Sequence, residues 1–320
     1  MTHLDSLYSE RRRKFGPTKF VTVGNERRLA YKEEDLGGQI VLAFHGSCMG
    51  KLSWLPVEPI GGVRLISVDR MGSGESTTVI WDEYSMAEEM VDILQLVEQL
   101  DLRDFFVAGF SAGGTLALRT AAQCPSRVRG CLAVSATTDC YHPQAPKDLQ
   151  KGIPVVASGQ FRGCCGGAVF RWLITSAVKP LTQGDGMPPH KLEKMGNDQI
   201  KNDCVPASRV KEIESGPNVE FDFSRDWDDV RGGFTDTNAF TRDCYSRTQP
   251  WPEDLSKIAC PVLLYHGALD NDVKLAEAEF SERVIPRASL VKFESDSHHT
   301  MATRKHDALA AALQQWSAPV

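Results

Sequence analysis

Residues 109–113 read Gly-Phe-Ser-Ala-Gly and lie between two stretches of different periodicity. The apolar run at 105–108 before them is typical of a buried strand, and the Ala- and Leu-rich stretch at 115–123 after them predicts a helix, closed by Pro125. A G-x-S-x-G sequence in this context predicts a sharp turn that lifts the serine side chain above the end of a sheet. Ser111 is therefore a candidate nucleophile.

The same alternation of β-rich runs and helical patterns extends over residues 20–138 and returns after residue 251. It predicts an α/β fold with a mostly parallel sheet and helices on both faces. Strands are expected at 20–23, 28–31, 40–44, 65–68, 105–108, 130–135, 261–265 and 289–293, with a hairpin turn at Gly24-Asn25. Helices are expected at 115–123, 274–283 and 307–316, and after Ser85, which forms a capping box with Glu88.

The alternation breaks between residues 140 and 250, which are rich in Pro, Gly and isolated aromatic residues. We interpret this stretch as an inserted, mainly helical cap whose best helix runs near residues 168–178. The predicted organisation is a leader at 1–19, a core domain at 20–139, the cap at 140–250 and the rest of the core at 251–320.

A serine hydroxyl needs a base to take its proton and a third group to orient that base. With this type of turn the chain order is serine, acid, histidine, so the base is expected late in the chain. His298 follows the strand that ends at Phe293 and is the favoured base, with His299 as the alternative. His45 and His266 precede the expected acid and are interpreted as structural.

The acid is expected beyond the carboxyl end of a strand, where open α/β sheets place their sites. Asp270 follows the run at 261–265 in the sequence Gly-Ala-Leu-Asp and is the favoured residue. Asp272 and Asp139 remain alternatives, each with surface exposure as the simpler interpretation.

Four motifs in this order resemble those of the α/β-hydrolase superfamily, in the group with a serine nucleophile and an inserted cap. They are His45-Gly46 after the hairpin, Asp-Arg-Met-Gly-Ser-Gly-Glu-Ser at 69–76, the Gly-Phe-Ser-Ala-Gly-Gly turn at 109–114, and Gly-Ala-Leu-Asp at 267–270 with Val273 and the late His298. The resemblance covers residues 20–138 and 251–320. It implies an α/β-hydrolase fold whose cap sets the choice of substrate, and it specifies no substrate.

By this resemblance, the backbone N–H groups of Ala112 and of Ser47 or Cys48 would form an oxyanion hole. Cys48 is also a thiol whose alkylation could affect activity without a catalytic role.

An apolar substrate pocket is expected beside the predicted nucleophile. Met49 and Trp54 follow the first His-Gly pair, and Phe110 precedes the serine. Simple packing of Trp54 in the core remains an equal alternative.

Composition narrows the remaining classes of function. A net charge of −6 offers no basic field for nucleic acid, and the one basic run, at 11–14, is interpreted as a solvated leader. No apolar run is long enough to span a membrane and no signal-peptide core is present, so the expected compartment is the cytoplasm. Nine cysteines without metal-site spacing favour free thiols, and neither a metal nor a cofactor is expected.

The sequence thus predicts a carboxylesterase-like serine hydrolase that cleaves an ester, thioester, lactone or related acyl bond of a small, largely apolar molecule. Two alternatives stay open. One is a receptor-like or binding protein of the same fold with little or no turnover, and the other is a carbon–carbon bond hydrolase or lyase.

Overall fold

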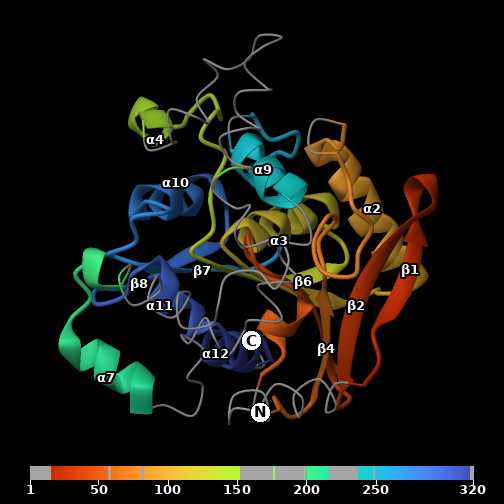
Figure 1. Ribbon diagram of the computed structural model, residues 1–320, viewed down its shortest axis with the longest axis horizontal. Helices are drawn as coiled ribbons and strands as arrows, with labels where there is room; N and C mark the ends of the chain where they lie inside the picture. The colour runs from red at the N-terminus through yellow and green to blue at the C-terminus, as the bar shows by residue number, and fades with distance from the viewer. Residues whose placement is uncertain are drawn as a thin grey trace.

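A single eight-stranded sheet forms the centre of the described part of the chain (Figure 1). The computed structural model describes residues 16–56, 59–80, 83–151, 176, 198, 200–215, 237–247 and 249–317. The strands are β1 (Lys19–Val23), β2 (Arg27–Asp35), β3 (Gln39–Phe44), β4 (Val63–Val68), β5 (Phe105–Phe110), β6 (Val128–Val134), β7 (Val262–Gly267) and β8 (Ala288–Phe293). Their order across the sheet is β1-β2-β4-β3-β5-β6-β7-β8.

The first strands of this sheet form an antiparallel edge. β1 pairs with β2 and β2 pairs with β4 in antiparallel register, and the expected turn between β1 and β2 places Asn25 at φ 55°. Every later neighbour pair is parallel. The mostly parallel sheet predicted from the sequence is therefore confirmed.

Helices pack on both faces of the sheet. They include α2 (Met86–Gln99), α3 (Ala112–Gln123), α10 (Leu275–Val284), α11 (His298–Ala302) and α12 (Lys305–Ser317). α2 and α3 bury their apolar residues in one core cluster, and α12 buries Leu309 and Leu313 in a second cluster with alternate residues of the same strands. In Figure 1, α2 and α3 lie on one side of the sheet and α12 on the other.

Helix α2 begins where its sequence predicts. The Ser85 hydroxyl accepts the N–H of Glu88, and the Glu88 carboxylate accepts the N–H of Ser85, which satisfies two of the backbone donors that a helix start leaves open.

The chain between β6 and β7, residues 135–261, contains the stretch at 140–250 for which a cap is expected, and we call it the β6–β7 insertion. Its described helices are α4 (Lys147–Lys151), α7 (Ala207–Ser215), α9 (Thr237–Ser246) and the short 3-10 helix η4 (Leu255–Lys257). In Figure 1, α9 lies over α2 and α3, and α7 lies near α11 at the opposite end of the sheet. The helix expected at 168–178 and the basic run at 11–14 lie outside the described residues. Within the described part of the chain, no helix combines the length and apolar character needed to cross a membrane.

Because β3, β5, β7 and β8 are parallel, their carboxyl ends meet at one edge of the sheet. His45 follows β3, Ser111 follows β5, Asp270 lies shortly after β7, and His298 lies shortly after β8. The edge therefore gathers every residue expected to carry the chemistry.

Candidate active site

Ser111 stands in a strained turn between β5 and α3. Its φ of 54° and ψ of −124° are unfavourable for a residue with a side chain, so the surrounding contacts must hold it there. A Cβ on Gly109 would lie 2.1 Å from the carbonyl oxygen of Gly113, and a Cβ on Gly113 would lie 2.1 Å from that of Phe44. Only glycine lets the helix and the two strands approach this closely.

His298 lies between Ser111 and Asp270. The Ser111 hydroxyl donates to His298 Nε2 at 3.0 Å, and His298 Nδ1–H donates to Asp270 Oδ2 at 2.8 Å. Asp270 Oδ1 in turn accepts the backbone N–H groups of Asp272 at 3.0 Å and Val273 at 2.8 Å. The three side chains form an unbroken hydrogen-bonded line from hydroxyl to buried carboxylate.

Asp270 and His298 each stabilise the charged form of the other. Burial lowers the pKa of His298, but the Asp270 carboxylate and its hydrogen bond outweigh that effect and raise the pKa above its usual range. Burial raises the pKa of Asp270, but the charge of His298 and the hydrogen bond between them bring it below its usual range. The carboxylate therefore stays ionised and stabilises a positively charged His298 ring.

His299, the alternative base, points elsewhere. Its Nε2 lies 3.4 Å from Asp272 Oδ2, and burial together with the neighbouring His298 lowers its pKa. Asp139 is buried and accepts the backbone N–H of Tyr141 at 2.9 Å. His298 is the first residue of α11, a short helix that begins after Ser297 and that was not among the helices expected from the sequence.

The two earlier histidines contact backbone groups around the site. His45 Nε2 accepts the N–H of Arg70 at 3.0 Å, so Nδ1 carries the proton that it donates to the carbonyl of Gly46 at 2.7 Å. Burial and the neighbouring Arg70 lower the pKa of His45 to about 3, which keeps the ring neutral. His266 donates from Nε2 to the carbonyl of Val273 at 2.9 Å and thereby holds the turn that carries Asp270.

The residues expected around an oxyanion lie beside Ser111. Ala112 is the first residue of α3, where backbone N–H groups have no partner within the helix. Gly46 packs so closely that an added Cβ would lie 3.2 Å from Ser111 Cβ, and Cys48 has a left-handed φ of 64°. The loop that carries Ser47 and Cys48 therefore lies against the candidate nucleophile.

The expected pocket residues divide into two groups. The Phe110 ring lies 5.1 Å from the His298 ring, and Met49 is half-buried against the second core cluster. Trp54 is fully buried, and its indole N–H donates to the carbonyl of Phe44 at 2.7 Å. Trp54 thus packs in the core and supports the end of β3. This agrees with the interpretation of Trp54 as a core residue, not as a pocket residue.

Residues 39–304 match the family model described as the alpha/beta hydrolase fold. The chain belongs to the α/β-hydrolase fold family. A non-heme chloroperoxidase, CPO-A1 of Kitasatospora aureofaciens, is 27% identical over 277 residues, which are 82% of this chain and 85% of that protein. A putative 2-succinyl-6-hydroxy-2,4-cyclohexadiene-1-carboxylate synthase of Bacillus subtilis is 31% identical over 120 residues, which are 37% of this chain and 44% of that protein.

Solved structures agree with the fold of the α/β-hydrolase family. An α/β-hydrolase fold protein from Nakamurella multipartita superposes with a TM-score of 0.64 at 22% identity, and the match covers 94% of this chain and 98% of that one. At this identity the likeness shows the fold alone.

Two contacts between the α/β-hydrolase core and the β6–β7 insertion had no sequence signal. Asp243 of α9 accepts the hydroxyl of Ser47 at 2.7 Å. Arg209 of α7 donates from Nε to Asp296 at 2.7 Å, two residues before His298. The elements that follow β3 and β8 are thus each held by a charged side chain of the insertion. In the described part of the chain, no group of three or more His, Cys, Asp or Glu side chains is arranged to hold a metal ion.

Proposed function

We propose that this protein is a serine hydrolase that cleaves an ester, thioester, lactone or related acyl bond through an acyl-enzyme on Ser111. The observation that carries the proposal is the hydrogen-bonded line of Ser111, His298 and Asp270, which has the geometry required of a nucleophile, a general base and an orienting acid. The strained backbone of Ser111 supports the same assignment.

The proposed reaction has two halves. Ser111 Oγ attacks the carbonyl carbon while His298 Nε2 takes the hydroxyl proton, and backbone N–H groups of Ala112 and of Ser47 or Cys48 bind the oxyanion. The protonated His298 then gives its proton to the leaving group, whose bond to the carbonyl carbon breaks. In the second half a water molecule, deprotonated by His298, attacks the acyl-enzyme and releases the acid, and Ser111 regains its proton.

The proposed substrate is a small, largely apolar molecule. Phe110 lies against His298, and Met49, in the loop that follows β3, is partly buried against the second core cluster. Two charged pairs lie at the described part of the site, Asp270 with His298 and Asp243 with Arg70. Apolar residues beside Ser111, with the neighbouring described charges in pairs, favour a neutral acyl group over a charged one.

Labelling by a fluorophosphonate probe tests the nucleophile without knowledge of the substrate. Intact mass is expected to show one adduct on the folded wild type, none on Ser111→Ala, and much slower labelling of His298→Ala. His299→Ala is the matched control, because it removes the neighbouring ring while leaving the pair with Asp270 in place, and it is expected to label at nearly the wild-type rate. A folded wild type without an adduct would contradict the proposal and favour the receptor-like alternative.

A second candidate, carbon–carbon bond hydrolysis, is favoured by a partial similarity to a 2-hydroxy-6-oxononadienedioate/2-hydroxy-6-oxononatrienedioate hydrolase of Paraburkholderia xenovorans, which is 30% identical over 120 residues, 35% of this chain and 42% of that protein. Both candidate enzymes would react with the fluorophosphonate probe. The test that distinguishes them is whether an ester substrate leaves an acyl group on Ser111. Brief mixing with p-nitrophenyl butyrate, followed by acid quenching, is expected to add one butyryl group to the wild type and none to Ser111→Ala. If the wild type reacts with fluorophosphonate but neither hydrolyses the ester nor retains an acyl group, the second candidate is favoured.

A further inference from the structure

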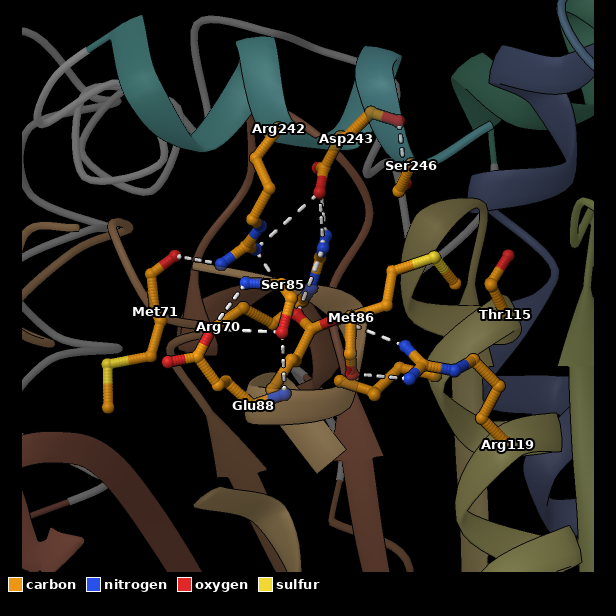
Figure 2. Close-up of polar contacts among 12 residues, drawn as sticks. Arg70, Met71, Ser85, Met86, Glu88, Thr115, Arg119, Arg242, Asp243 and Ser246 are labelled. Atoms are coloured by element: carbon orange, nitrogen blue, oxygen red, sulfur yellow. Dashed lines mark hydrogen bonds and ion pairs between the residues drawn. The ribbon is translucent and has the colours of Figure 1, made fainter. Parts of the chain in front are cut away.

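Asp243 joins the β6–β7 insertion to the loop that follows β3. Its Oδ2 accepts the Ser47 hydroxyl at 2.7 Å and Arg70 Nη1 at 3.0 Å, and its Oδ1 accepts Arg70 Nη2. Figure 2 shows Arg242 and Asp243 extending from α9 toward Arg70. Ser47 and Asp243 are 196 positions apart in the chain, so the contact exists only when α9 lies on the core.

This contact belongs to a buried network of alternating charges. Glu89 of α2 lies within ion-pair distance of three guanidinium groups: Arg242 at 3.2 Å, Arg119 at 3.3 Å and Arg70 at 3.5 Å. Within the described residues, the network contains three arginines and three carboxylates, all buried, namely Arg70, Arg119, Arg242, Glu89, Asp243 and Glu253. Buried charges are tolerated only with well-matched partners, so the network fixes the position of α9.

Close packing limits the movement of α9 in the same place. A Cβ on Gly72 would lie 3.2 Å from Cβ of Ala239 in α9, and Arg242 Nη1 donates to the carbonyl of Met71 at 3.0 Å (Figure 2). Burial raises the pKa of Asp243, but the Arg70 and Arg242 charges lower it below its usual range, so the carboxylate stays charged and can accept the Ser47 hydroxyl.

Arg70 holds the loop after β3 from two directions. Its backbone N–H donates to His45 Nε2, and the His45 ring donates to the carbonyl of Gly46. Its side chain binds Asp243, which binds Ser47. The residues whose N–H groups are proposed to bind the oxyanion are therefore fixed on both sides, and Cys48 is held in a left-handed conformation that a free loop would leave.

We propose that Asp243 is a positioning residue for the oxyanion hole: it holds the Ser47 hydroxyl so that the loop of Ser47 and Cys48 presents its N–H groups before substrate arrives. The inference rests on the proposed function and extends it to the β6–β7 insertion, which thereby contributes to the rate of the chemical step. Donors that are fixed in advance stabilise an oxyanion more than the uncharged ground state, so their loss lowers kcat rather than raising KM.

Two variants test the role of Asp243, and a third is a matched control. Asp243→Asn removes the charge from the network, whereas Ser47→Ala removes only the hydroxyl and keeps the backbone N–H and the ion pairs. Asp92→Asn is the control, because Asp92 is also buried and also accepts two hydrogen bonds from one arginine, Arg27, which is the first residue of β2 on the antiparallel side of the sheet.

The readouts are kcat and KM for p-nitrophenyl butyrate, the fluorophosphonate labelling rate, and the Ki of a trifluoromethyl ketone, which forms an oxyanion when serine adds to it. For Asp243→Asn we expect kcat about tenfold to a hundredfold lower, with KM changed by less than about threefold. Ser47→Ala should show about a tenfold loss, with Ki for the ketone rising in parallel. Asp92→Asn should have a lower Tm and wild-type kcat.

Each other outcome has a definite meaning. Equal losses in Asp243→Asn and Asp92→Asn, a rise in KM alone, or a higher kcat after removal of the negative charge would overturn the inference and leave the proposed function intact. If Asp243→Asn does not fold, Ser47→Ala decides alone, and wild-type kcat and Ki in that variant overturn the inference. A wild type that does not react with fluorophosphonate overturns the proposed function and this inference together.

Discussion

His298 Nδ1 lies 2.8 Å from Asp270 Oδ2, although the two residues are 28 positions apart and lie beyond different strands. The contact is possible because β7 and β8 are parallel neighbours, with Gly267 paired to Phe293 at their carboxyl ends. A Cβ on Gly267 would lie 2.2 Å from the carbonyl oxygen of Asp296, so the loops that carry the acid and the histidine touch directly. The contact between Asp270 and His298 orients the His298 ring and raises its pKa.

The raised pKa of His298 predicts the pH dependence of activity. A general base acts only as the neutral imidazole, so kcat/KM is expected to increase with pH, with a midpoint above the ordinary histidine value of 6.5. Asp270→Asn removes the charge that raises the pKa, so it should move the midpoint to lower pH and reduce kcat by about 10⁴-fold. The measurement is the pH profile of p-nitrophenyl butyrate hydrolysis, and a midpoint below 6.5 in the wild type would contradict the assignment of His298.

The turn around Ser111 predicts a large cost for one added methyl group. In Gly113→Ala the new Cβ would meet the carbonyl oxygens of Phe44 at 2.1 Å and His45 at 2.4 Å, and backbone atoms cannot swing away. We expect a loss of about 3 kcal/mol in the free energy of unfolding, measured by chemical denaturation. Gly61→Ala is the control, since that position is exposed with no neighbouring atom within 4 Å, and it should leave stability nearly unchanged. Similar losses in both variants would show that the close packing at Gly113 is not what limits substitution.

The core elements and the three aligned side chains could be predicted because their signals are local. Ser111 lies in a five-residue motif at a strand-to-helix junction. Asp270 follows an apolar run that forms the buried strand β7, and His298 follows the shorter β-rich stretch that forms the edge strand β8. Parallel strands then bring these loops to one edge of the sheet without any further information. The helical start of α11 was missed, because a helix of five residues has too little periodicity to be seen.

The contacts of the β6–β7 insertion could not be predicted, because they join residues that are far apart in the chain. No sequence pattern links Asp243 to Ser47. An aspartate in a polar helix is indistinguishable from a solvated charge until the fold places Arg70 beside it. The same holds for Arg209 and Asp296. The choice between pocket wall and core for Trp54 also needed the structure, because burial depends on what covers a side chain and not on its neighbours in the chain.

Arg209 is expected to stabilise the loop that carries His298. It donates to Asp296 Oδ1 at 2.7 Å and to Thr303 Oγ1 at 2.9 Å, while Arg304 donates to Asp296 Oδ2 at 2.8 Å. Arg209→Met removes one of the two charges that neutralise a buried carboxylate, so we expect a loss of about 3–5 kcal/mol in the free energy of unfolding.

Chemical denaturation compares Arg209→Met with a surface pair. Arg103→Ala removes an ion pair to Asp101 of similar length, 2.9 Å, in which the two side chains are 79% and 74% exposed, and solvent screening should leave stability unchanged. If Arg209→Met is as stable as Arg103→Ala, α7 does not hold the loop.

The burial and pKa of the described cysteines predict which thiol reacts first with an alkylating reagent. Cys48 lies beside the proposed oxyanion hole, but burial, followed by the nearby Cys244 and Asp243, raises its pKa well above the ordinary thiol value, so little thiolate forms near neutral pH. Cys204 is exposed. Among the described cysteines, brief iodoacetamide treatment should therefore modify Cys204 well before Cys48, as peptide mass spectrometry would show. Fluorophosphonate labelling of Ser111 should survive this first alkylation and should be unchanged in Cys204→Ala. Faster modification of Cys48 would mean that its thiol is open to solvent and that the loop of Ser47 and Cys48 is not held as the network around Asp243 requires.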